Sequence, residues 1–249
     1  SVNAQWLRLA GGAVALRLGQ AWRGISACLF GLRAQVLFWL MAPVVWLVSV
    51  LTPDPTTAWR FSHRSARLLL RLTGLTLDVR GLQHLPVDGR GVLVCNHASY
   101  LDGLVLVAAL GKPCTFVAKR ELERQQVAGR FLRHLGVAFV ERFDPRRSVA
   151  DAQQMAERAL GEAPLLVFPE GTFVAAPGLL PFRLGAFLAA AQSGVPVIPI
   201  SLGGTRYLLG AGRWWPRKTA LSVIVGAPLG VSQPMQSFTA AVQLRDRAR

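Results

Sequence analysis

The chain has 249 residues, which suits one domain of ordinary size, or a domain with an appendage, and allows a substantial core. Hydrophobic residues make up 52% and charged residues 16%, which is too apolar for a typical soluble domain and too interrupted for a multi-span transporter, so a membrane-associated globular protein fits best. The 28 lysines and arginines outnumber the 13 acidic residues, a formal net charge of +15 that favours lipid headgroups, nucleic acid or phosphorylated metabolites as partners.

Before residue 81, arginine and tryptophan are interleaved around apolar runs, the composition of a membrane interface. Residues 34–51 carry no charge and as a helix would span roughly 27 Å, a borderline length for crossing a bilayer. Because Pro43 lies in the middle, a kinked or re-entrant segment is as well supported as a straight span. Residues 6–32 are expected to form an interfacial helix or the first arm of a hairpin. The alternative for 34–51 is a buried helix of a soluble protein.

The proline-rich stretch TPDPTT at residues 52–57 predicts a domain boundary. We therefore expect a membrane-associated helical segment at residues 1–58 and an α/β domain at residues 59–249. Directly after the boundary, residues 61–73 have the pattern of an amphipathic basic helix, and Gly74 is expected to end it.

Over the rest of the chain, short apolar runs of strand type alternate with helical patterns. Several of these runs do not alternate in polarity, as is typical of strands buried on both faces. The pattern predicts an α/β fold with a mixed, largely parallel sheet flanked by helices, beside the N-terminal membrane-binding helical segment. The expected strands are 75–80, 91–95, 113–118, 137–141, 164–168, 195–200 and 219–225, and the expected helices are 102–110, 121–135, 147–160 and 183–193.

His97 and Asp102 lie on either side of the turn that follows the apolar run ending at Cys95, and two interpretations fit them. In the first, Ser99 and Asp102 form a capping box at the start of a helix, and His97 is satisfied by backbone at a strand end. In the second, the turn folds His97 back over the helix start, so that Asp102 accepts from one imidazole nitrogen and leaves the other as a base. The two interpretations are compatible, and open α/β sheets place their sites where a strand feeds a helix.

Other patterns that carry chemistry are weak. Cys28, Cys95 and Cys114 are odd in number and lie in apolar contexts, which predicts buried thiols in a reducing compartment rather than disulfides or metal ligands. The chain has no G-x-S-x-G motif for a nucleophilic serine. Residues 202–213 are rich in glycine but match neither a phosphate-binding nor a dinucleotide-binding motif, so we expect a loop there. We therefore expect no metal and no resident cofactor.

Four short blocks follow one another along the chain: NHASYLD at 96–102, GVAFVER at 136–142, FPEGT at 168–172 and GVPVIPI at 194–200. Each block alone is weak, and FPEGT has the composition of a plain turn. In this order, the four resemble the blocks of the glycerophospholipid acyltransferase family, whose best-known members acylate lysophosphatidic acid. The resemblance covers roughly residues 75–225, and the N-terminal membrane-binding segment is also similar to what the family carries.

The resemblance implies a role for each matching residue. His97 takes the proton from a glycerol hydroxyl as general base, Asp102 orients it, and no covalent acyl-enzyme is needed. The implied donor is acyl-CoA or acyl carrier protein, and the implied acceptor is a lysophospholipid, first of all 1-acylglycerol-3-phosphate, which gives phosphatidic acid. The implied substrate-binding residues are Arg142 for the acceptor phosphate, Glu170, Gly171 and Thr172 in the acceptor loop, and the basic residues Lys119 and Arg183.

One departure from the family pattern concerns the third block. Many members continue FPEGT with arginine and serine, whereas this chain has Phe173 and Val174 and so lacks one phosphate partner. Arg183 is a candidate replacement; alternatively, the acceptor is a lysophospholipid with a larger headgroup, such as the ethanolamine type, or a non-glycerol lipid. The expected location is the cytoplasmic face of the inner membrane, with membrane phospholipid and no nucleic acid as partner. A non-catalytic lipid-binding membrane protein is the alternative of a different class.

Overall fold

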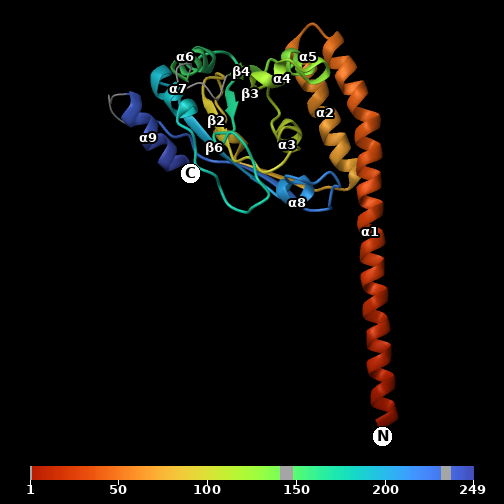
Figure 1. The fold of residues 1–249 in the computed structure, drawn as a ribbon. Helices are drawn as coiled ribbons and strands as arrows, with labels where there is room; N and C mark the ends of the chain where they lie inside the picture. The colour runs from red at the N-terminus through yellow and green to blue at the C-terminus, as the bar shows by residue number, and fades with distance from the viewer. Residues whose placement is uncertain (1, 141–147, 231–236) are drawn as a thin grey trace.

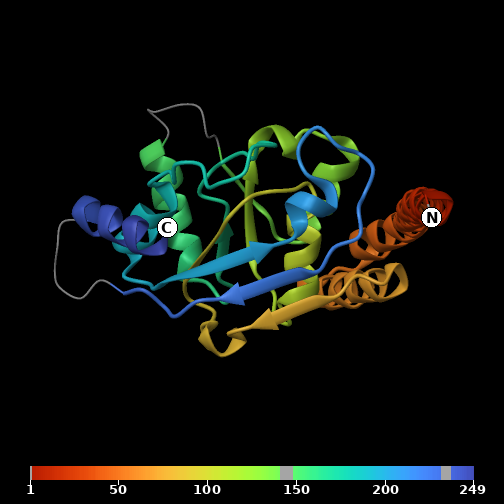
Figure 2. The ribbon, with the colours of Figure 1, turned by 90° about the horizontal axis from the view of Figure 1, so that it is seen from below.

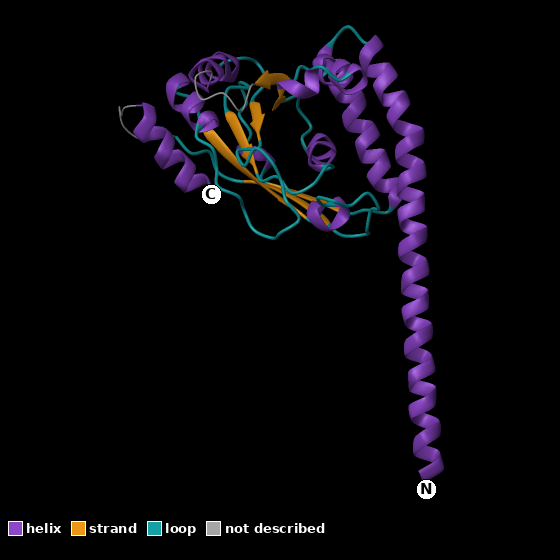
Figure 3. Ribbon diagram, viewed as in Figure 1, coloured by secondary structure: helices purple, strands orange, loops and turns teal. Residues whose placement is uncertain are grey.

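The computed structural model describes residues 2–140, 148–230 and 237–249, and for residues 2–18 and 148–152 it describes the backbone alone. Within this part of the chain, a seven-stranded sheet has helices on both faces and a pair of helices, α1 and α2, at one end (Figures 1 and 3). The N-terminal half of α1 extends well beyond the sheet domain (Figure 1).

Helix α1 (Val2–Leu51) runs through Pro43 without interruption, so of the alternatives left open by the sequence the re-entrant segment and the hairpin arm are wrong. The reason is tertiary: α1 packs against α2 and α5, and Nε1 of Trp46 donates to the carbonyl oxygen of Val127 at 2.9 Å. Such packing offsets the backbone hydrogen bond that a proline removes. Residues Gly19–Leu51 are long and apolar enough to cross a membrane, judged by length and composition.

The outward side of α1 carries large apolar residues, mostly three or four positions apart, each at least 48% exposed. Residues at this spacing share one face of a helix. An exposed apolar face of this length is a marker of a membrane or protein contact. We call this face the apolar stripe. It consists of Trp22, Ile25, Leu29, Leu32, Val36, Trp39, Leu40, Val44, Leu47 and Leu51.

Helix α2 (Pro55–Thr73) returns antiparallel to α1, and its ends follow the expected rules (Figure 1). Asp54 caps the start, because its side chain accepts from the N–H groups of Thr56 and Thr57. Gly74 ends the helix in the left-handed conformation, which confirms the expected stop. The structure places the start of α2 at Pro55, while the division of the chain at residue 58 stays a prediction.

The sheet is mixed and largely parallel, as expected. Its strand order is β1-β7-β6-β2-β5-β3-β4, and the pair β6–β7 is antiparallel while the other neighbouring pairs are parallel. Each strand falls on one of the expected apolar runs. The strands are β1 (Leu77–Arg80), β2 (Val92–Cys95), β3 (Thr115–Lys119), β4 (Ala138–Val140), β5 (Leu165–Val167), β6 (Val197–Gly203) and β7 (Leu221–Val225).

Helices cover the sheet on both faces, which explains why the central strands are apolar throughout (Figure 2). Leu93 and Cys95 of β2 pack in one core cluster with α2 and α3 (Asp102–Ala109). Val92 and Val94 point to the opposite face and pack with α6 (Ser148–Ala159), α7 (Gly185–Ser193) and α9 (Ser237–Ala248). Every residue of β2 is therefore buried.

Three local expectations are wrong. Two helices, α4 (Arg120–Glu123) and α5 (Gln126–His134), stand in place of the single helix expected at 121–135. Gly129 of α5 packs closely on the Glu123 carbonyl. The loop expected at 202–213 contains α8 (Thr205–Leu209), set between Gly204 and Gly210. Cys28 is exposed on α1 rather than buried, whereas the other two thiols are buried. A short 3₁₀ helix (Leu82–His84) follows β1.

Gly204, at the junction of β6 and α8, has a φ of +85°, and a Cβ added there would lie 2.1 Å from the Ala220 carbonyl oxygen. Gly212 has a similar φ of +72° but no neighbour within 4 Å of such a Cβ. We expect Gly212→Ala to lower the free energy of unfolding by about 1–2 kcal/mol, and Gly204→Ala by roughly 2–5 kcal/mol, because it adds a steric clash to the backbone strain. Denaturant titration in detergent compares the two variants, and equal losses would contradict the clash.

Candidate active site

The site lies at the carboxyl ends of two neighbouring strands. β2 and β5 pair in parallel, with Val94 opposite Val167, so the loops that follow them start side by side. The first loop carries His97 and the second carries FPEGT. Two of the sequence blocks, which are more than sixty residues apart in the chain, therefore meet at one edge of the sheet, where open α/β folds place their ligands.

His97 and Asp102 are hydrogen-bonded, with 2.8 Å between Nδ1 of the imidazole and Oδ2 of the carboxylate. Asp102 is the first residue of α3 and is fully buried, while the His97 side chain retains 20% of its exposure. Since a carboxylate accepts, Nδ1 carries the proton and Nε2 keeps its lone pair. The pair therefore has the geometry of a base and its orienting group.

Oδ2 of Asp102 also accepts from the N–H groups of Ala98 and Ser99, at 2.6 and 2.9 Å. The carboxylate thus caps the turn and orients His97 at once, so the two sequence interpretations of Asp102 coexist. The capping box itself is incomplete. Ser99 lies outside the first turn of α3, and its Oγ accepts from the Leu101 N–H at 3.0 Å and donates to the Leu209 carbonyl at 2.6 Å.

Glu170 is buried, and both of its carboxylate oxygens are engaged inside the protein. Oε1 accepts from the His97 N–H at 2.7 Å, and Oε2 accepts from the Leu180 N–H at 2.6 Å. The residue expected to reach the acceptor therefore ties the loop after β5 to the His97 loop and to the segment around Leu180. In this arrangement it sets the position of the histidine backbone.

Two phenylalanines enclose the imidazole of His97. The Phe168 ring stacks on it at 4.3 Å between centroids, and the Phe173 ring meets it edge-on at 4.5 Å. Tyr100 in turn packs edge-on against Phe173. Phe173 stands where the family resemblance leads one to expect arginine, so the departure replaces a cation by an apolar wall of the histidine site.

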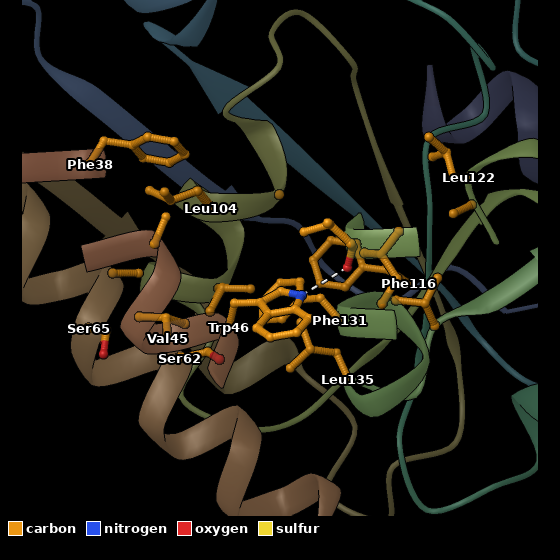
Figure 4. A pocket seen from close by; sticks show the side chains of 18 of the residues that line it. Phe38, Val45, Trp46, Ser62, Ser65, Leu104, Phe116, Leu122, Phe131 and Leu135 are labelled. Carbon is orange, nitrogen blue, oxygen red and sulfur yellow. Dashed lines mark hydrogen bonds between the residues drawn. The ribbon is translucent and has the colours of Figure 1, made fainter. Parts of the chain in front are cut away.

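A cavity of about 820 Å³ opens beside His97 and is lined almost entirely by apolar side chains. The cavity lies between the helix pair α1–α2 and the sheet domain. Residues of α1, α2, α3, β3 and α5 all contribute to its wall (Figure 4). The Trp46 ring projects from α1 into the middle of it, toward α5 (Figure 4). Its volume is in the range of pockets that bury an organic ligand. Large apolar side chains of the lining include Phe38, Trp46, Leu104, Phe116, Phe131 and Leu135.

Three of the remaining expected substrate-binding residues line this cavity, and a fourth lies against one of them. Lys119, Gly171 and Thr172 line it. Arg183 lies against the third block, because a Cβ added at Gly171 would be 2.9 Å from its Nε, and Gly171 also has a φ of +74°. Only glycine suits this close approach and this backbone conformation. Arg142 falls outside the described residues.

Two polar side chains that sequence reasoning missed hold the loops of the site. The Asn96 side chain pairs with the backbone of Leu202 on β6, donating to its carbonyl at 3.0 Å and accepting from its N–H at 2.7 Å. Arg206 of α8 donates to three carbonyls of the segment that follows FPEGT. These are the carbonyls of Ala176, of Val174 at 2.8 Å and of Gly178 at 3.1 Å. Asn96 is part of the first block, whereas no local signal marks Arg206.

Cys95 lies close to the histidine but is unsuited to act as a nucleophile. Burial, with smaller contributions from the charges of Asp102 and Glu170, raises the pKa of its thiol well above the usual value. The thiol therefore stays protonated and donates weakly to the Asn96 carbonyl. Among the described residues, no three histidine, cysteine, aspartate or glutamate side chains are grouped so as to hold a metal ion.

The fold and the site define a class of α/β proteins in which a histidine–carboxylate pair at the carboxyl edge of the sheet faces an apolar cavity. Comparison with known proteins makes this specific. Residues 76–203, about half of the chain, match the family model described as Acyltransferase. The chain belongs to the acyltransferase family.

Individual relatives are similar over large parts of the chain. The chloroplast 1-acyl-sn-glycerol-3-phosphate acyltransferase of Brassica napus is 35% identical over 202 residues, which cover 79% of this chain and 58% of the relative. The alpha form from Homo sapiens is 37% identical over 130 residues, 52% of this chain and 46% of the relative. The chain thus spans about half of the length of these relatives.

A solved structure confirms the fold class. The crystal structure of the 1-acyl-sn-glycerophosphate acyltransferase from Thermotoga maritima superposes with a TM-score of 0.68 over 90% of this chain and 95% of that chain. Sequence identity over this match is 22%, so the likeness is one of fold.

Arg206 offers a test of how the segment 174–180 is held. Arg206→Ala removes three hydrogen bonds to backbone carbonyls, so we expect the Leu180 amide, which donates to Glu170, to exchange its hydrogen about tenfold faster or more. Hydrogen exchange followed by mass spectrometry measures this rate. Arg213→Ala, which removes an exposed arginine outside this network, is the control. An unchanged exchange rate in Arg206→Ala would show that the segment 174–180 keeps its conformation without Arg206.

Proposed function

We propose that the protein transfers a fatty acyl group from acyl-CoA or acyl carrier protein to the free hydroxyl of a lysophospholipid, first of all 1-acylglycerol-3-phosphate, giving phosphatidic acid. The observation that carries the proposal is the placement of the His97–Asp102 pair at the mouth of a large apolar cavity. Membership of the acyltransferase family, and relatives that bear the name of this activity, support the same reaction.

The reaction begins with removal of a proton from the acceptor. Nε2 of His97 takes the hydroxyl proton as the oxygen attacks the thioester carbonyl, and Asp102 stabilises the positive charge that develops on the imidazole. A base of this kind typically contributes about 10²–10⁴ in rate. The tetrahedral intermediate then collapses: the carbon–sulfur bond breaks, and the thiolate takes the proton back from His97. The histidine is regenerated without a covalent acyl-enzyme.

The cavity supplies a place for the fatty acyl chain of a substrate. Its wall is apolar, so burying methylene groups there is favourable, at roughly 0.8 kcal/mol per group. Residues of α1, including Phe38 and Trp46, form part of that wall, and the same helix carries the apolar stripe on its outward side. A lipid substrate therefore has a short path between a membrane that α1 contacts and the base.

The acceptor phosphate is proposed to contact Arg183, with Lys119 as a second cation on the cavity wall and Arg142 as a third candidate. Guanidinium meets phosphate in a bidentate manner, which suits Arg183 to the task. Phe173 supports a second candidate acceptor, because it presents an apolar ring beside His97 where the family pattern has a cation. That acceptor is a lysophospholipid of the ethanolamine type, or a non-glycerol lipid.

We propose that the protein works on the cytoplasmic face of the inner membrane, held by α1. The apolar stripe and the length of α1 support membrane association, and the net charge of +15 supports an anionic lipid surface. A lipid-binding protein without activity would retain the cavity and the stripe but would turn over no substrate. Labelled acyl-CoA and 1-acylglycerol-3-phosphate, given to the purified protein in lipid vesicles, separate the two.

The dyad is tested by two substitutions. His97→Ala is expected to abolish transfer without unfolding the protein. Asp102→Asn is expected to lower kcat by about 10²–10⁴, because the amide oxygen can still accept from the turn and from Nδ1 of His97, but the negative charge that stabilises the imidazolium is lost. Turnover and melting temperature are measured together. Turnover that survives Asp102→Asn, with a lower melting temperature alone, would leave Asp102 a purely structural cap.

Ser99→Ala serves as the matched control for the dyad. It removes the bonds of Oγ to Leu101 and Leu209 but leaves the His97–Asp102 contact in place. We expect it to lower the melting temperature and to reduce kcat far less than Asp102→Asn does.

The acceptor is tested with a panel of lysophospholipids and Arg183→Gln. We expect this substitution to raise KM for 1-acylglycerol-3-phosphate about 10- to 100-fold, since a charged hydrogen bond is lost, and to raise KM for the ethanolamine type less, because its phosphodiester carries less negative charge. Arg158→Gln, which neutralises an exposed arginine at the end of α6, is the control. If KM for 1-acylglycerol-3-phosphate stays as it is in the unmodified protein, Arg183 does not bind the phosphate. Faster turnover of the ethanolamine type by the unmodified protein would favour the second candidate acceptor.

A further inference from the structure

The loop between α8 and β7 carries two adjacent tryptophans in contrasting environments. Trp215 packs against α1, because a Cβ added at Gly31 would lie 2.2 Å from its indole nitrogen. Trp214 is 78% exposed, although it is among the largest side chains of the protein. Arg213, Arg217 and Lys218 around it are also exposed. We call residues 213–218 the tryptophan loop.

Gln35 joins the tryptophan loop to the apolar stripe of α1. Its Nε2 donates to the carbonyl of Trp214 at 2.7 Å, and its Oε1 accepts from Nε1 of Trp39 at 3.1 Å. Trp39 belongs to the stripe and is 67% exposed. Seen from below, the loop, in blue, approaches α1 from one side while α2 lies on the other (Figure 2). The loop therefore borders the stripe on the side away from α2.

We propose that the tryptophan loop is a second membrane-contact element, seated among the headgroups of the same anionic bilayer surface that the apolar stripe faces. The inference rests on the membrane association proposed above. Tryptophan favours this depth because its ring is apolar while its N–H still reaches water or headgroup oxygens. Arg213, Arg217 and Lys218 supply the charge that attracts anionic headgroups.

A contact beside α1 has a consequence for the sheet domain. The apolar stripe alone attaches α1 to the membrane along one line, whereas a contact off the helix axis gives the sheet domain a second point of attachment. The tryptophan loop lies shortly after α8 in the chain, and Arg206 of α8 binds the backbone of residues 174–178 at the site. The loop would therefore set the direction in which the active-site edge of the sheet faces the lipid surface.

The test places an environment-sensitive fluorophore at single cysteines in the full chain, with Cys28→Ser as background because the other two thiols are buried. The labelled variants are Trp214→Cys, Leu40→Cys on the stripe, and Phe238→Cys on α9. Phe238 is an exposed aromatic of α9, and α9 lies on the far side of the sheet domain from α1 (Figure 1). Each protein is reconstituted into vesicles of phosphatidylcholine and phosphatidylglycerol whose acyl chains are brominated near the headgroup end.

We expect the probes at 214 and 40 to lose most of their emission to the brominated lipid and to be shielded from aqueous iodide. The probe at 238 should keep its emission and remain open to iodide. Lipid quenching at 40 without quenching at 214 would overturn the proposal and leave membrane association standing. Iodide shielding at 214 without lipid quenching would indicate a protein contact and would overturn it too. Without quenching at 40, membrane association itself fails and the loop proposal fails with it.

Discussion

One carboxylate oxygen, Oδ2 of Asp102, accepts hydrogen bonds from the His97 ring and from the N–H groups of Ala98 and Ser99. The side chain is fully buried at the first residue of α3, so the turn that starts the helix also fixes the imidazole. Folding of this turn and orientation of the imidazole therefore depend on a single group. The arrangement needs β2 to end where it does, since His97 must lie within reach of the helix start.

The loops around His97 are held by side chains that bond to backbone rather than to one another. Glu170 binds the N–H groups of His97 and Leu180, Asn96 binds Leu202, and Arg206 binds the carbonyls of a third loop. Backbone partners do not depend on which side chains line the site. The position of these loops therefore does not rest on hydrogen bonds from lining side chains such as Phe173.

The sequence predicted the sheet well because its strands are buried on both faces and appear as continuous apolar runs. The pairing of His97 with Asp102 was predictable because both lie on one turn. By contrast, Glu170 binds the His97 backbone and Arg206 binds the Val174 backbone only because separate loops meet after folding. No local pattern in the sequence therefore reveals these contacts. The helix interruption considered at Pro43 does not occur, for a related reason: the local tendency of proline to break a helix is outweighed by packing of α1 on α2 and α5.

Helix α1 has two sides in different environments: Phe38, Val45 and Trp46 line the cavity, while the apolar stripe faces outward. Deleting the helix to obtain a water-soluble fragment would uncover the rings of Phe116 and Phe131 and open the cavity to solvent. A soluble version of this protein therefore has to keep α1 and exchange its outward residues for polar ones. The apolar stripe and this wall of the cavity belong to one helix and cannot be removed separately by deletion.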